Sequence, residues 1–94
     1  MRERDQIADW LVERVAETLA IDIALVRSDI AFSDLGLSSM QAVELSDDLQ
    51  RFTSLMLPPT LVFDYPTIDG AAGFVAQELA RAGGSLPVPG QSRR

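Results

Sequence analysis

The chain has 94 residues, of which 47% are hydrophobic and 23% charged, and this composition is typical of one globular domain with a small core. It contains no cysteine, so we expect no disulfides. No apolar run approaches the roughly 20 residues of a membrane span, and the N-terminus lacks the apolar segment of a signal peptide. We therefore expect a cytoplasmic protein without membrane partners. Its formal net charge of −6 disfavours nucleic-acid binding and indicates either a basic protein partner or an acidity that only maintains solubility.

The first predicted element is an amphipathic helix over residues 5–19. Ile7, Trp10, Leu11, Val15 and Leu19 recur at intervals of three and four residues, with charged residues between them. This spacing predicts that one face of the helix is buried, with Trp10 in the core or at its rim.

Residues 20–33 lose the helical period and are interpreted as a long ordered loop. A loop of this length is uncommon in a small domain unless it is functional or packs with its own apolar residues. We therefore expect Ile30 and Phe32 to attach the loop to the core.

A second long helix is predicted to follow Ser38 and to run to about residue 53. Gly36 tolerates a positive φ, and Ser38 stands three residues before Gln41, which is the spacing of a capping box. Ser38 is thus the expected N-cap and Ser39 the first helical residue. The stripe expected to face the core comprises Ala42, Leu45, Leu49 and Phe52.

Acidic residues occupy another face of this helix, at Glu44, Asp47 and Asp48. Met40 and Val43 lie next to this acidic stripe. Exposed apolar residues flanked by carboxylates indicate a docking surface, whereas the same two side chains could equally lie at the edge of the core.

The remaining elements are short or terminal. Pro58 and Pro59 interrupt the chain, residues 60–64 can form only one helical turn, and Thr67 is placed to cap a last helix over residues 68–81. Residues 83–94, rich in Pro, Gly and Ser, are interpreted as a flexible linker or tail, which leaves residues 1–82 as the domain. The predicted fold is all-α, with three main helices, one short helix and a long first loop.

The chemistry available to this chain is limited because it lacks His, Cys and Lys. A serine nucleophile normally needs a neighbouring base, and Glu44, Asp47 and Asp48 are expected on an exposed face rather than in a cleft. No calcium-binding loop motif is present, and we expect neither a metal site nor catalytic residues. A serine at a helix N-terminus can instead act as a cap or accept an anionic modification, because the helix dipole stabilises negative charge there.

Two blocks of the sequence resemble one known family. Acyl carrier proteins have a 4′-phosphopantetheine attachment motif that is similar to residues 32–45, FSDLGLSSMQAVEL. Carrier domains of modular type I polyketide synthases have a downstream block that is similar to residues 57–67, LPPTLVFDYPT. The order and separation of the blocks match the family, and the resemblance extends over residues 5–81.

This resemblance implies a four-helix acyl-carrier bundle in which Ser39 carries 4′-phosphopantetheine derived from coenzyme A. It also implies a non-catalytic, monomeric domain that holds acyl groups as thioesters on the thiol of the cofactor. The implied partners are phosphopantetheinyl transferase, acyltransferase, ketosynthase and tailoring domains, which would dock on Met40, Val43, Glu44, Asp47 and Asp48.

The chain departs from the family pattern in two places. Ser38 replaces the usual Asp before the modified serine, and Ser54 stands near a position where many relatives have Gly. Asp and Ser are both good N-caps, so the helix itself should be unaffected by the first change. The alternatives are a peptidyl or fatty-acyl carrier domain, or a helical interaction module in which Ser39 is unmodified; an enzyme is the third alternative.

Overall fold

The computed structural model describes residues 3–84 and contains only helices and connecting segments. The elements are α1 (Glu3–Leu19), the 3-10 helix η1 (Ile23–Leu25), α2 (Phe32–Leu35), α3 (Ser39–Thr53), α4 (Leu61–Asp64) and α5 (Ile68–Arg81). Over this described part there is no strand, only one isolated bridge between Ala31 and Thr67. The predicted all-α fold and its three main helices are confirmed. Most of the predicted tail, residues 85–94, lies outside the described residues.

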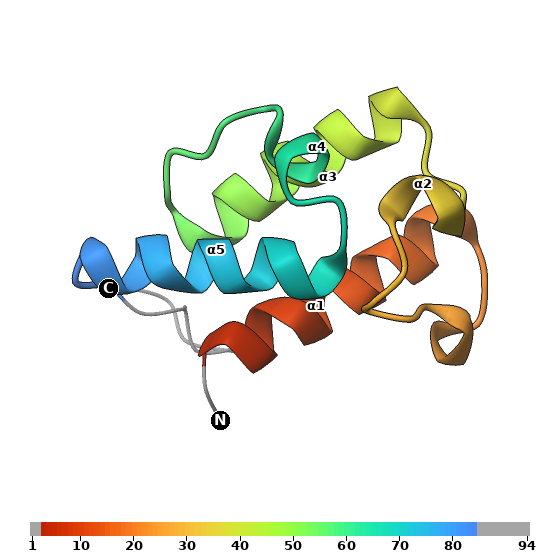
Figure 1. Ribbon diagram of the computed structural model, residues 1–94, viewed down its shortest axis with the longest axis horizontal. Coiled ribbons are helices and arrows are strands. Elements are labelled where there is room, and N and C mark those ends of the chain that lie inside the picture. The colour runs from red at the N-terminus through yellow and green to blue at the C-terminus, as the bar shows by residue number, and fades with distance from the viewer. Residues whose placement is uncertain (1–2, 85–94) are drawn as a thin grey trace.

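The largest helix–helix interface is between α1 and α5, which run side by side with α3 above them (Figure 1). α4 packs against α3, so the core lies between the three long helices and is closed by this single turn. Seven side chains are almost completely inaccessible to solvent: Ile7, Leu11, Leu49, Leu61, Ile68, Val15 and Val75. They come from α1, α3, α4 and α5, which explains why the three long helices among these show an apolar face in the sequence.

The first loop contains more structure than its sequence indicated. Asp22 caps η1 by accepting a hydrogen bond from the backbone of Ala24, and α2 forms where only irregular chain was expected. Helices of three or four residues have too few positions to show a period, which is why the pattern missed them.

Two residues of this loop belong to the buried core cluster, but only one of them was predicted. Phe32 is buried as expected, whereas the prediction for Ile30 was wrong: Ile30 is only half-buried and does not belong to the core cluster. Val26, at the end of η1, is buried instead. The structured turn at η1 rotates the chain and decides which apolar side chain points inward.

The helices described within residues 3–84 include none with the length and apolar composition of a membrane span.

Candidate functional site

The start of α3 is shaped by a glycine turn at the end of α2. Gly36 has φ 112°, a left-handed conformation, and its backbone N–H donates to the carbonyls of Phe32 and Ser33. The N–H of Leu37 also donates to Phe32 O, at 3.1 Å, and the Leu37 side chain is buried. This arrangement closes α2, anchors the chain at Leu37 and directs the next residue, Ser38, into the cap of α3.

Ser38 and Ser39 are adjacent, but their hydroxyls have different environments. Ser38 Oγ accepts a hydrogen bond from the N–H of Gln41 at 3.1 Å, while the N–H of Ser38 donates to Gln41 Oε1 at 2.9 Å. The predicted capping box is therefore confirmed. Ser39 is the first helical residue, is exposed, and makes no side-chain hydrogen bond to any residue of the described chain. The Ser39 hydroxyl is thus free to react.

The electrostatics at this end of α3 favour an anion on Ser39. The first turn contains no acidic side chain, so the positive end of the helix dipole is not neutralised by the helix itself. A negative group attached there is stabilised by about 0.3–1 kcal/mol when exposed to solvent.

A small hollow of about 170 Å³ lies beside Ser39. Its lining comes from α2, the start of α3, α4 and the segment that follows: Phe32, Ser33, Leu37, Ser38, Ser39, Ala42, Val62, Phe63 and Pro66. Phe63 and Pro66 belong to the family-like block of residues 57–67, but their position beside Ser39 was not predicted from the sequence. The sequence signal that could have singled out Phe63 is its position as an aromatic residue in a single helical turn. In the structure, the Phe63 side chain is 52% exposed.

The predicted docking residues lie on the outer surface of α3. Met40 is 73% exposed and Val43 is 42% exposed, so neither is a core residue. Glu44 and Asp47 are also exposed, whereas Asp48 is half-buried. The structure therefore brings apolar and acidic side chains together on the helix that begins with Ser39.

Two of the three carboxylates on this face already have internal partners. Arg51 donates to Asp47 at 2.7 Å and to Asp48 at 3.0 Å. Arg14 of α1 also lies 3.8 Å from Asp48 and is positioned over the ring of Trp10. Glu44 has no ion pair within residues 3–84. Glu44 is therefore the carboxylate most available to a partner.

Within the described chain, the structure shows no metal-binding cluster of His, Cys, Asp or Glu. Nor does any described residue place a basic side-chain atom within hydrogen-bond distance of the Ser39 hydroxyl. Among the described residues, the Ser39 hydroxyl therefore has no hydrogen-bonded side-chain base.

Comparison with known proteins agrees with this geometry. The family model for the phosphopantetheine attachment site matches residues 9–75, a segment that includes Ser39. Members of this family carry a 4′-phosphopantetheine prosthetic group.

The curated relatives are large synthases of which this chain spans only a few per cent. It is 42% identical over 94 residues to the spectinabilin polyketide synthase system protein NorA′ of Streptomyces orinoci, covering 98% of this chain and 3% of that protein. It is 52% identical over 64 residues to the pikromycin polyketide synthase component PikAII of Streptomyces venezuelae, covering 64% of this chain and 2% of that protein.

Two solved structures share both fold and sequence with this chain at 32% identity and a TM-score of 0.78. One is the HMG-ACPI domain from the CurA module of Lyngbya majuscula, with 85% of this chain and 81% of that one aligned. The other is a free-standing peptidyl carrier protein of Acinetobacter baumannii, with 84% of this chain and 99% of that one aligned. Because the family model matches residues 9–75 and solved carrier domains align with most of the chain, the chain belongs to the phosphopantetheine attachment-site family of carrier domains.

Proposed function

We propose that this domain tethers acyl groups as thioesters on a 4′-phosphopantetheine arm attached to Ser39. The observation that carries the proposal is the free, exposed hydroxyl of Ser39 beside a Ser38 whose hydroxyl is occupied by the capping box. The capping box occupies the N–H groups of Ser38 and Gln41 and leaves those of Ser39 and Met40 for a phosphate, which fits the group that the family carries.

The residues present fit the attachment but do not catalyse it. Ser39 Oγ forms a new P–O bond to the phosphopantetheine phosphate of coenzyme A, the bond from that phosphorus to the adenosine bisphosphate breaks, and the hydroxyl proton passes to a base of the transferase. When bound, the cofactor supplies the thiol that forms the thioester. This division suits a chain that has neither cysteine nor histidine, and we propose that the domain itself is non-catalytic.

The sequence relatives support a role in polyketide synthesis. We propose that the domain is monomeric, acts in the cytoplasm and serves several enzymes. Its proposed partners are phosphopantetheinyl transferase, acyltransferase, ketosynthase and tailoring domains. We propose that they dock on the outer face of α3, at Met40, Val43, Glu44, Asp47 and Asp48. A peptidyl carrier is the second candidate, because the Acinetobacter baumannii peptidyl carrier protein aligns as well as the HMG-ACPI domain.

Incubation with coenzyme A and a broad-specificity phosphopantetheinyl transferase, followed by intact-protein mass spectrometry, tests the attachment site. The wild-type chain should gain one phosphopantetheine, located on Ser39 by fragmentation. Ser39→Ala should gain none. Ser38→Ala is the matched control, which should still be modified although it loses about 1 kcal/mol of stability with the cap.

Modification that survives Ser39→Ala and disappears in folded Ser38→Ala would move the site to Ser38. An unmodified wild-type chain, tested with several transferases, would favour the interaction module with an unmodified Ser39. The enzyme that loads the domain distinguishes the two carrier types. Loading by an acyltransferase supports the polyketide role, and loading by an adenylation domain supports the peptidyl role.

A further inference from the structure

Methionine is the side chain through which this chain can be oxidised reversibly, because the sequence contains three methionines and no cysteine. Peroxides convert the methionine thioether to a sulfoxide, and methionine sulfoxide reductases restore it. Met1 lies outside the described residues, whereas Met40 is 73% exposed and Met56 is 92% exposed. Both described thioethers are therefore open to an oxidant in solution.

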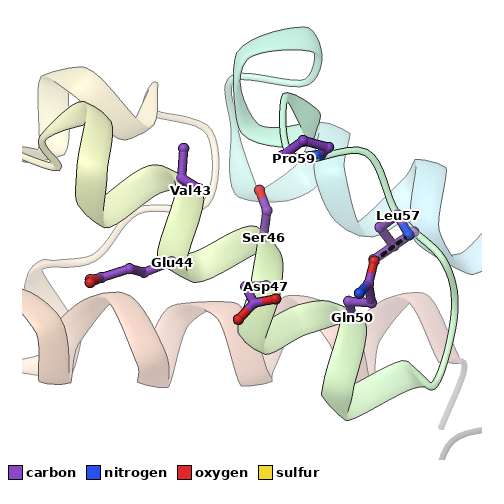
Figure 2. Close-up of a pocket in the computed structure, with 7 residues that line it drawn as sticks. All are labelled: Val43, Glu44, Ser46, Asp47, Gln50, Leu57 and Pro59. Atoms are coloured by element: carbon purple, nitrogen blue, oxygen red, sulfur yellow. Dashed lines mark hydrogen bonds between the residues drawn. The ribbon is translucent and has the colours of Figure 1, made fainter.

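Met40 has a special position, because it is the second residue of α3 and follows Ser39 directly. Val43 lies three residues farther on, which makes it a neighbour of Met40 on the helix surface, and it is 42% exposed. In Figure 2 the Val43 side chain points away from α1 and borders a pocket of about 300 Å³ whose lining includes Leu57 and Pro59. Met40 and Val43 thus form an exposed apolar surface between Ser39 and this pocket.

Oxidation would change this surface without disturbing the core. A sulfoxide replaces a flexible apolar side chain with a polar, chiral one. In the free domain, water can hydrogen-bond to the new oxygen because Met40 is exposed. A partner that covers Met40 removes this water, and a buried polar atom without a hydrogen bond is costly. The effect of the sulfoxide should therefore appear when a partner binds and not in the stability of the fold.

We propose that Met40 is a site of reversible oxidation, and that its sulfoxide slows the attachment of phosphopantetheine to Ser39. The sulfur attacks one oxygen of hydrogen peroxide, an S–O bond forms, the O–O bond breaks and water leaves. The sulfur loses two electrons, which the peroxide gains. The inference rests on the proposed carrier function, because the enzyme that modifies Ser39 must approach the residue beside it.

The unmodified domain is the form in which this oxidation matters. It has no thiol that could react with the peroxide first, because the proposed thiol arrives only with the cofactor. Met56 is equally open to the oxidant but lies beyond the far end of α3, a helix of 15 residues and about 22 Å in length. Met56 therefore provides an internal control for oxidation away from Ser39.

The test treats the unmodified domain with hydrogen peroxide and removes the peroxide before coenzyme A and phosphopantetheinyl transferase are added. Trypsin separates the two methionines, because residues 28–51 contain Met40 and residues 52–81 contain Met56. Mass spectrometry should find one added oxygen in each peptide. The oxidised domain should show a kcat/KM for the transfer that is at least about five-fold lower, since a polar atom would be buried without a partner. Methionine sulfoxide reductases should restore the original value.

Two variants assign the effect to one sulfur atom. Met40→Leu keeps a side chain of similar volume without sulfur, so its kcat/KM should be the same before and after peroxide. Met56→Leu retains Met40 and should lose activity on oxidation as the wild-type domain does. The urea midpoint of the oxidised wild-type domain should remain near that of the untreated domain. A lower midpoint that is absent in oxidised Met40→Leu would assign the loss to unfolding and overturn the proposal.

The proposal is also overturned if Met40 stays unoxidised while Met56 gains oxygen, or if a domain oxidised at Met40 is modified at the untreated rate. Equal slowing of Met40→Leu and wild type by peroxide would overturn it as well. The untreated wild-type reaction distinguishes the two ideas. A wild-type domain that is never modified refutes the carrier function, whereas modification that is insensitive to Met40 oxidation refutes only the oxidation site.

Discussion

At the scale of single residues, one backbone conformation positions the two serines. Gly36 has φ 112°, where a residue with a Cβ is strained by about 1–2 kcal/mol. A Cβ at this position would approach only Leu19 Cδ2 within 4 Å, at an ordinary contact distance of 3.8 Å. The constraint on Gly36 is therefore the backbone angle and not the available space.

Gly36→Ala should lower the free energy of unfolding by about 1–2 kcal/mol, because the backbone at this position remains left-handed. Gly73→Ala is a useful control in the interior of α5, where the new Cβ would find its nearest neighbour, Arg4 Nε, at 3.9 Å. That control should gain about 0.5–1 kcal/mol. Urea denaturation measures both changes, and a neutral or stabilising Gly36→Ala would contradict the argument.

The ion pairs of the acidic residues on α3 could be predicted from the sequence only in part. Arg51 lies four residues after Asp47 and three after Asp48, so both internal pairs could have been predicted from their helical spacing. The contact of Asp48 with Arg14 could not, because these residues are distant in the sequence and meet only when α1 packs near α3.

At the scale of elements, the start of α5 is tied both to its own cap and to the first loop. Thr67 Oγ1 accepts a hydrogen bond from the N–H of Gly70 at 3.0 Å, as the sequence predicted. The N–H of Phe32 donates to Pro66 O at 2.7 Å, and the N–H of Asp69 donates to Ser28 O at 3.0 Å. These bonds hold the loop that leads to Ser39 against the last helix.

Thr67→Ala should lower the free energy of unfolding by about 1 kcal/mol through loss of this cap. The comparison is Thr60→Ala, since Thr60 precedes α4 without a side-chain cap and its hydroxyl donates instead to the exposed Asp64 carboxylate at 3.1 Å. Thr60→Ala should cost less than about 0.5 kcal/mol. Thermal unfolding monitored by circular dichroism would reveal the difference, and equal losses would show that the Thr67 bond adds nothing.

At the scale of the whole molecule, one small core joins all the helices that present the site. α1 and α5 form its largest interface, and an aromatic stack of Trp10 on Phe52, with ring centroids 4.9 Å apart, links α1 to α3. A domain of this size has a total stability of roughly 5–15 kcal/mol, so a single core side chain is a large share of it.

Leu11→Ala should lower the free energy of unfolding by about 2–5 kcal/mol, because Leu11 is fully buried and its truncation leaves a cavity. Leu25→Ala removes the same atoms from a residue that is 65% exposed, and should change stability by less than about 0.5 kcal/mol. Denaturant midpoints provide the measurement. A similar loss for both variants would mean that Leu25 is covered in solution.

The sequence by itself determined the three long helices, the cap at Ser38 and the position of Ser39 on the first helical turn. These features depend on residues within a few positions of one another, which fix the helical period and the cap hydrogen bonds. Only the tertiary structure decided that Val26 rather than Ile30 is buried, that Phe63 lies beside Ser39, and that a pocket forms between α3 and the segment carrying Leu57 and Pro59. Each of these depends on the direction in which the irregular segments turn as they pack on the core, and no local period in the sequence encodes that direction.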